Sequence, residues 1–203
     1  MDIRNIRKVA WFTLSNLAAG SPAQVQCLVQ KGIFNRVYDV LTNTDWSTNQ
    51  CGTLFFTSQD LNIKEDITWC LGNVFDPDEV TLETKANMMA VLNCNHSQAG
   101  DHHDEEDSMH GITAIFEATH ILISSDIQGG DRQTRIELAS KLMKILEVIT
   151  GPAMLSPRIN AKLKKSSKRV IAILQACLQQ HSTNLSRLTE SVCDQVLMRI
   201  AEA

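Results

Sequence analysis

Two pairs of residues in this chain place a carboxamide one helical turn after an aromatic ring. Phe12 precedes Asn16 and Trp69 precedes Asn73, so the members of each pair share one face if the chain is helical there. An Asn side chain can both donate to and accept from the backbone of an extended peptide. The ring offers a flat surface to a Lys or Arg side chain, with an attraction of about 0.5–2 kcal/mol. These pairs therefore predict peptide binding.

The sequences around the two pairs are alike, which indicates an internal repeat. With Asn16 aligned on Asn73, the stretch KVAWFTLSNLAAG lies over EDITWCLGNVFDP. A single such pair usually packs in a core, but two copies, one of them inside a long stretch that resembles a known family, favour a ligand site. The spacing of 57 residues exceeds the about 40–47 of common helical repeats, so the polar stretch Thr42–Asn62 is expected to hold a loop insertion.

Potential metal donors surround an acidic run at residues 101–107. Their spacing fits no ordered zinc site, so a solvated loop is the favoured interpretation, and no metal and no cofactor are predicted. The donors are Cys94, His96, His102, His103 and His110.

A basic stretch covers Arg158–Arg169. On a helix, Lys162, Lys165 and Arg169 fall on one side, which is typical of a solvated helix face. Electrostatic contact with the acidic run at 101–107, or with an acidic partner, is the other interpretation.

Motifs of catalysis are missing from the sequence. It has no Gly-rich phosphate loop, no G-x-S-x-G and no H-E-x-x-H. The adjacent carboxylates Glu105 and Glu106 lie in a polar stretch where nothing would shift their pKa. The chain is therefore predicted not to be an enzyme.

Apolar residues recur at helical spacing along most of the chain, and the predicted fold class is all-α. Gly20 followed by Ser21-Pro22, and Gly151-Pro152, separate neighbouring helices, while Asp131 and Ser156 are placed as N-caps. Helices are expected over residues 6–19, 22–31, 33–41, 63–75, 77–93, 112–124, 131–150, 156–181 and 185–201.

The composition is that of one folded unit or a short array of helical repeats. In 203 residues, 43% are hydrophobic and 21% charged, with only four Pro and nine Gly, which disfavours disorder and many-stranded β folds. Residues 1–100 carry seven basic and ten acidic side chains, residues 101–155 four and ten, and residues 156–203 eight and three. The net charge of −4 disfavours nucleic acid as a partner.

The distribution of apolar residues and cysteines indicates the cellular compartment in which the chain is expected. No apolar stretch is long enough for a membrane span, so no membrane partner is expected. The six cysteines form no C-x-x-C, and the N-terminus lacks a signal-peptide pattern. A reducing compartment, cytoplasmic or nuclear, is expected.

The stretch Arg7–Phe34, RKVAWFTLSNLAAGSPAQVQCLVQKGIF, resembles an armadillo repeat of the importin-α family. The third helix of that repeat carries a W-x-x-x-N pair, and DITWCLGNV around Trp69 resembles the third helix of the next repeat. Phe12 stands at the family's tryptophan position, with Trp11 one residue earlier. The resemblance covers about a quarter of the chain, over residues 4–41 and 64–76.

The resemblance implies a right-handed armadillo-type α-solenoid of three to five helical repeat units. It also implies a non-enzymatic adaptor that recognises basic nuclear localisation signals for nuclear import, in the cytoplasm and the nucleus. Importin-β and an export receptor would be further partners. The implied peptide-binding residues are Phe12, Asn16, Trp69 and Asn73, with Trp11 and Asp76 beside them.

The expected organisation is armadillo-like repeats over 1–93 with the insertion near 42–62, an acidic flexible loop over 94–111, and further helical repeats or a cap over 112–203. The alternative is a helical scaffold subunit whose groove is filled by a partner or by its own insertion. A metal-binding regulatory module, which would copurify with zinc, is a third hypothesis.

Overall fold

The computed structural model describes residues 3–42, 58–75, 81–94, 109–124, 131–180 and 182–202. Within these ranges the regular structure is helical and contains no strand, which confirms the all-α prediction. The helices are α1 (Ile3–Ala18), α2 (Pro22–Gln30), α3 (Ile33–Thr42), α4 (Ser58–Phe75), α5 (Leu82–Leu92), α6 (His110–Ile123), α7 (Arg132–Thr150), α8 (Pro157–Lys165), α9 (Ser167–Leu178) and α10 (Thr183–Glu202), with a 3-10 turn η2 (Pro152–Met154) before α8.

Local signals set several helix ends as the sequence predicts. Pro22 opens α2, and Gly32, with a φ of 67°, forms the corner between α2 and α3 in a conformation that favours glycine. The Asp131 carboxylate accepts a hydrogen bond from the backbone N–H of Thr134 at 2.9 Å and so caps α7. The same bond lowers the pKa of Asp131.

Several predicted boundaries differ from the structure, three of them next to residues that the structure does not describe. Helix α4 begins at Ser58, inside the predicted insertion, of which residues 43–57 lie outside the described part of the chain. Helix α6 begins at His110, inside the predicted acidic loop, of which residues 95–108 also lie outside. Helix α5 is predicted to begin at residue 77, but its N-cap in the structure is Thr81. The Thr81 Oγ1 accepts a hydrogen bond from the N–H of Thr84 at 3.1 Å.

The single helix predicted over 156–181 is two helices, α8 and α9. The backbone bends at Ser166, whose N–H still bonds to Lys162 O at 3.0 Å while its carbonyl accepts from Val170 N at 2.9 Å. Since the hydrogen bonds and the apolar spacing continue on both sides of this residue, periodicity alone misses the bend.

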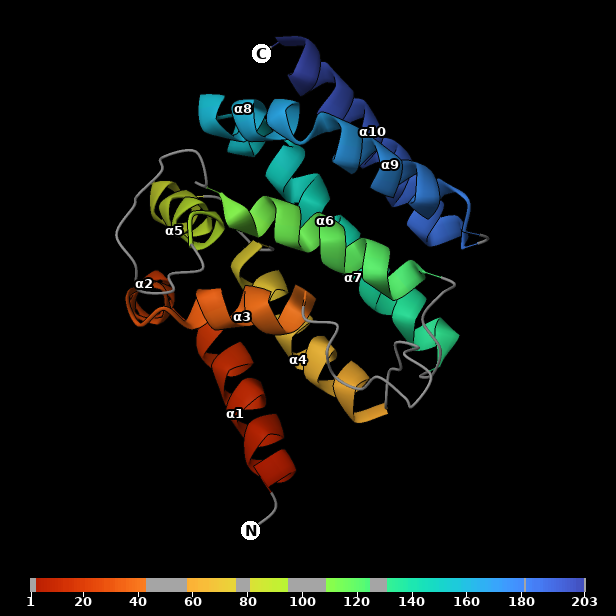
Figure 1. Cartoon of the computed structure of the whole chain (residues 1–203). Helices are drawn as coiled ribbons and strands as arrows, with labels where there is room; N and C mark the ends of the chain where they lie inside the picture. The colour runs from red at the N-terminus through yellow and green to blue at the C-terminus, as the bar shows by residue number, and fades with distance from the viewer. Residues whose placement is uncertain are drawn as a thin grey trace, which may run out of the picture.

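Six helices, α1 to α4, α6 and α7, each pack against the helix three positions further along the chain. One row is α1, α4, α7 and α10, in which each helix contacts the next. A second row is α3, α6 and α9, and α2 packs on α5. In Figure 1 these rows rise from α1 at one end of the molecule to α10 at the other.

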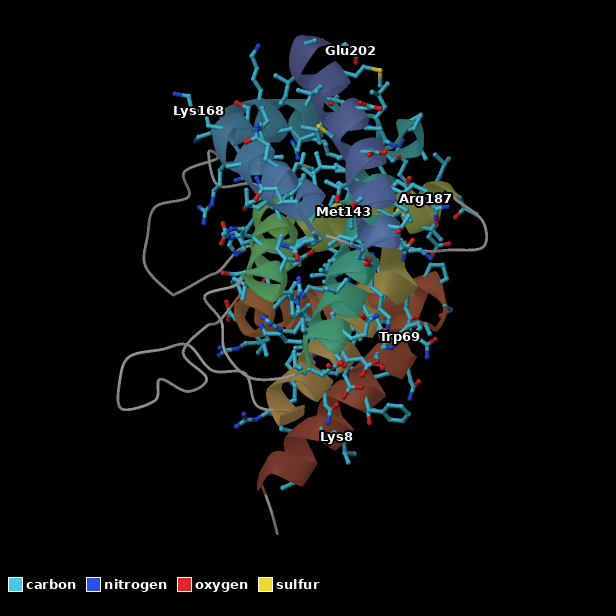
Figure 2. All side chains as sticks on the ribbon, turned by 90° about the vertical axis from the view of Figure 1, so that its right-hand side faces the viewer. Lys8, Trp69, Met143, Lys168, Arg187 and Glu202 are labelled. Atoms are coloured by element: carbon cyan, nitrogen blue, oxygen red, sulfur yellow. The ribbon has the colours of Figure 1, made fainter. Side chains whose placement is uncertain are left out.

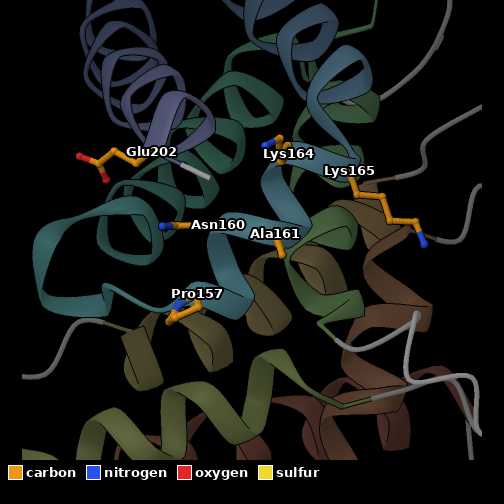
Figure 3. Close-up of a pocket in the computed structure, with 6 residues that line it drawn as sticks. All are labelled: Pro157, Asn160, Ala161, Lys164, Lys165 and Glu202. Atoms are coloured by element: carbon orange, nitrogen blue, oxygen red, sulfur yellow. The ribbon is translucent and has the colours of Figure 1, made fainter.

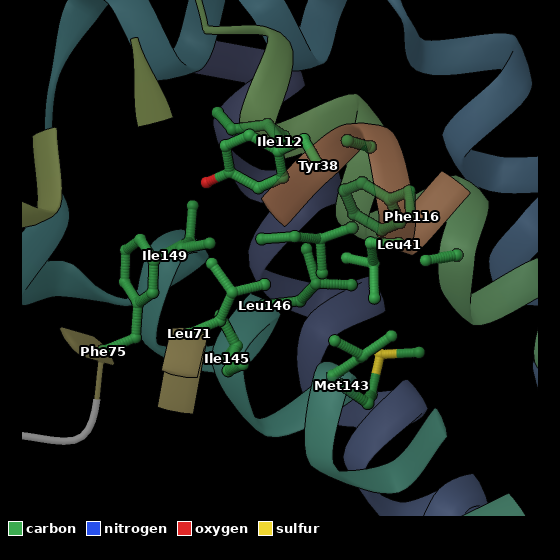
Figure 4. Packing of buried hydrophobic residues seen from close by; sticks show 14 of the residues in the cluster. Tyr38, Leu41, Leu71, Phe75, Ile112, Phe116, Met143, Ile145, Leu146 and Ile149 are labelled. Carbon is green, nitrogen blue, oxygen red and sulfur yellow. The ribbon is translucent and has the colours of Figure 1, made fainter. Parts of the chain in front are cut away.

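One apolar cluster runs between the rows (Figure 4). Phe34, Phe75 and Leu146 are fully buried in it. Helix α6 can approach α3 closely because residue 111 is Gly, since a Cβ there would lie 2.5 Å from the Tyr38 hydroxyl oxygen. The core thus joins helices from all parts of the chain and fixes the rows relative to one another.

Basic side chains of the α4–α7–α10 row close the carboxyl ends of other helices. Lys64 of α4 donates its Nζ to Leu41 O at 2.6 Å, at the end of α3. Arg135 of α7 donates Nη1 to Ser124 O at 3.2 Å, at the end of α6. Each of these two contacts joins a helix of the row to the end of the helix that precedes it in the chain.

Candidate functional site

The helices of the row α1, α4, α7 and α10 follow one another from one end of the molecule to the other, and Figure 2 labels Trp69 of α4. On this row Phe12 is 57% exposed and Trp69 is 50% exposed. Helix α1 packs directly on α4, so the two rings belong to neighbouring helices. We call the exposed side of these four helices the row face.

A hydrogen bond aligns the two predicted pairs. The Asn73 Nδ2 donates to the backbone carbonyl of Ser15 at 2.8 Å, and that carbonyl also accepts from Ala19 N–H at 3.1 Å. Asn16, the next residue after Ser15, is exposed. Asn73 therefore uses one N–H to join α4 to α1 at the residue before Asn16. An amide has a second N–H and an acceptor oxygen, which are the atoms suited to a ligand.

Trp69 holds a cation supplied by the chain itself. The Lys141 Nζ, from α7, lies 4.4 Å from the centroid of the indole ring. The same Nζ lies 3.4 Å from Glu65 Oε1, one helical turn before Trp69 on α4. A ring and a carboxylate on one helix thus receive one ammonium group, an arrangement that combines cation–π and ionic attraction. We call Trp69 and Glu65 the cation subsite.

The row face carries both signs of charge. Burial raises the pKa of Asp66. The nearby positive charge of Lys8 acts to lower this pKa, and the negative charge of Glu65 acts to raise it. Helix α7 adds Lys144, which is exposed, as well as Lys141. The face therefore contains separate carboxylates that can meet cations, rather than a continuous acidic channel.

Trp11 does not join this face, and the prediction that it contributes to peptide binding is wrong. Its ring is only 8% exposed and belongs to the apolar core. One residue is about 100° around a helix, so Trp11 and Phe12 point in different directions. Asp76, the remaining predicted binding residue, lies outside the described part of the chain.

Sequence reasoning missed two members of the site. Glu65 lies four residues before Trp69, so helical spacing alone was sufficient to place it on the same face. Lys141 comes from a helix that is distant in sequence, and only the packing of α7 on α4 reveals it.

The predicted metal donors are only partly described. Histidines 96, 102 and 103 lie outside the described residues, and among those that are described no group of three His, Cys, Asp or Glu side chains could hold a metal ion. Cys94 donates its thiol to Ala90 O at 3.4 Å, and burial raises its pKa to about 11. A metal ion binds the deprotonated thiolate, and the raised pKa of Cys94 disfavours that form.

The basic stretch forms part of another surface. Arg169 pairs with Glu117 at 3.1 Å. An open hollow of about 600 Å³ lies between α8 and the end of α10 (Figure 3). Its lining contains none of the predicted peptide-binding residues and consists of Pro157, Asn160, Ala161, Lys164, Lys165 and Glu202.

Comparison with known proteins adds no relative. No family model, no curated protein and no solved structure matches this chain. Over the described ranges, no helix has both the length and the apolar content that crossing a membrane requires. A function for this chain is therefore inferred from the geometry of the row face.

Proposed function

We propose that this chain is a non-enzymatic adaptor that binds an extended basic peptide along the row face. The observation that carries the proposal is the position of the Lys141 ammonium, 4.4 Å from the Trp69 ring centroid and 3.4 Å from Glu65 Oε1. A lysine of a bound peptide would find the same two partners. The subsite thus has the chemistry of a cation receptor.

The fold that suits this role is a right-handed armadillo-type α-solenoid. Its support is the packing of helices three positions apart and the matching caps made by Lys64 and Arg135. In such an array the α1–α4–α7–α10 row lines one continuous surface. An extended peptide crossing that row would meet each helix in turn.

The peptide would be fixed through both its backbone and its side chains. Asn16 is exposed, and Asn73 keeps one N–H and its oxygen for a second contact beyond Ser15. Phe12 offers an exposed ring for the stem of a further Lys or Arg. Peptide binding would therefore span at least α1 and α4.

Nuclear import is the process in which we place this binding. The proposal rests on the resemblance of the Phe12 and Trp69 segments to importin-α repeats, and the ligand is then a basic nuclear localisation signal of a cargo protein. The same resemblance suggests importin-β and an export receptor as further partners, and residence in both cytoplasm and nucleus.

Substituting Trp69 by Ala should weaken binding of a lysine-rich peptide by about tenfold, because the variant lacks both the cation–π contact and the wall beside Glu65. Asn16→Ala should weaken it by about fivefold through loss of one peptide hydrogen bond. Fluorescence anisotropy with a labelled peptide measures both. Leu155→Ala is the matched control, since Leu155 is 60% exposed but lies between η2 and α8.

Equal affinities for wild type, Trp69→Ala and Asn16→Ala would contradict the proposed groove. Far-UV circular dichroism of each variant separates lost binding from lost folding.

A scaffold subunit is the second candidate, favoured by one observation. Both the Asn73 bond to Ser15 and the Lys141 pair with Glu65 join helices of the chain to each other. A scaffold that uses these groups only for packing would bind no basic peptide at all, and Trp69→Ala would change its stability alone.

A further inference from the structure

We infer that Lys141 is a resident cation that occupies the subsite of Trp69 and Glu65 in the free protein and must leave when a peptide lysine enters. The inference rests on the proposed function and concerns its regulation. It assigns Glu65 to the ligand site and makes Lys141 an internal competitor. The affinity for a basic peptide is then set partly by how strongly α7 holds its own ammonium on α4.

The Lys141 ammonium is accessible enough to be exchanged. The Lys141 side chain is 35% exposed and that of Glu65 is 43% exposed, so water reaches the ion pair. Trp69 is 50% exposed, so its ring remains open to an incoming group. Exposed ion pairs contribute little to stability, so releasing this one does not require unfolding.

The incoming and outgoing groups are chemically identical. A peptide lysine would place the same ammonium on the same ring and the same carboxylate, so the attraction that it gains is partly offset by the loss of the weaker, half-exposed Lys141 contacts. Competition therefore lowers the apparent affinity of the peptide, since each binding event must first displace Lys141. Removing the Lys141 charge should empty the subsite and strengthen binding.

Lys144 provides a matched comparison for Lys141. It lies on the same helix, three residues later, and is exposed. Neutralising either lysine removes one positive charge from α7, so general repulsion of a basic peptide falls by a similar amount in both variants. The Trp69 ring contact, by contrast, is made by Lys141. The difference between the two variants therefore isolates the effect of emptying the subsite.

The test compares wild type, Lys141→Gln and Lys144→Gln in anisotropy titrations with one fluorescein-labelled lysine-rich peptide. We expect Lys141→Gln to bind about fivefold more tightly than wild type, and Lys144→Gln to differ by no more than about twofold. Equal gains in the two variants would reduce the effect to general charge and overturn the inference. Weaker binding by Lys141→Gln would show that Lys141 supports the site and would overturn it as well.

A second readout follows the resident cation directly. Ring current from Trp69 should shift the Lys141 Hε resonances of the free protein upfield, and Trp69→Leu should abolish this shift. Adding peptide to wild type should move these resonances to ordinary lysine positions. If the peptide binds in a Trp69-dependent way while the Lys141 resonances stay shifted, displacement is wrong and the proposed function stands. If no variant binds the peptide, the proposed function fails, and the inference fails with it.

Discussion

Replacing Arg199 by Ala should destabilise the protein by about 3–5 kcal/mol, because it leaves several buried acceptors without a donor. Arg199 is 1% exposed despite its charge. Its Nε donates to Thr150 O at 2.7 Å, Nη1 donates to Asn160 Oδ1 at 2.9 Å, and Nη2 donates to Gly151 O. One guanidinium thus closes the end of α7 and ties it to α8 and α10.

Urea unfolding followed by circular dichroism measures this effect. Arg199→Lys should recover only part of the stability, because an ammonium lacks the planar fork that reaches three acceptors. Arg187→Ala, an exposed position on the same helix, is the control and should change the free energy of unfolding by less than about 0.5 kcal/mol. A value for Arg199→Ala within that range would contradict the role given to its hydrogen bonds.

Replacing Lys64 by Met should cost about 2–3 kcal/mol, the next largest effect. The substitution keeps an apolar stem in the core but removes the ammonium that donates to Leu41 O at 2.6 Å and Val40 O at 3.2 Å. Those carbonyls stand in the last turn of α3, where no backbone N–H of the helix can reach them. The same unfolding measurement applies, and the transition should move to lower urea.

Two further substitutions are compared with Lys64→Met for their effect on the free energy of unfolding. Lys144→Met removes a lysine from an exposed position and should change stability by less than about 0.5 kcal/mol. Arg135→Met removes the hydrogen bond to Ser124 O, which at 3.2 Å is longer than the bond from Lys64 to Leu41 O. It should lower the free energy of unfolding by about 1 kcal/mol. A Lys64→Met variant as stable as Lys144→Met would show that water satisfies the α3 carbonyls.

The parts of the fold that sequence predicts well are those set by local chemistry. Pro22 and Asp131 mark helix starts because a fixed φ or a capping carboxylate acts within one turn. The burial of Lys64 depends instead on its contacts with α3, more than 20 residues earlier in the sequence. No window of neighbouring residues contains that information. The bend at Ser166 is missed for another reason, because local hydrogen bonds continue on both sides of it.

The candidate site also has residues that local spacing predicts and residues that only contacts between distant helices reveal. Helical spacing places Phe12 and Trp69 correctly as exposed rings on packed helices, and it separates Trp11 from Phe12 by about 100°. Trp11 was a binding residue only through its place beside Phe12 in the family-like segment, and the structure buries it in the core. Lys141 reaches Trp69 only through tertiary packing, which no spacing rule reveals.

The most direct measurement of peptide binding on the row face is the response of the indole N–H signals in a ¹H–¹⁵N spectrum. Trp69 is 50% exposed and Trp11 is 8% exposed, so the buried ring serves as an internal reference, and a Trp69→Phe variant assigns the signal. Adding a lysine-rich peptide should move the Trp69 signal in a saturable way and leave the Trp11 signal in place. A peptide that saturates the protein while the Trp69 signal stays fixed would contradict binding at the row face.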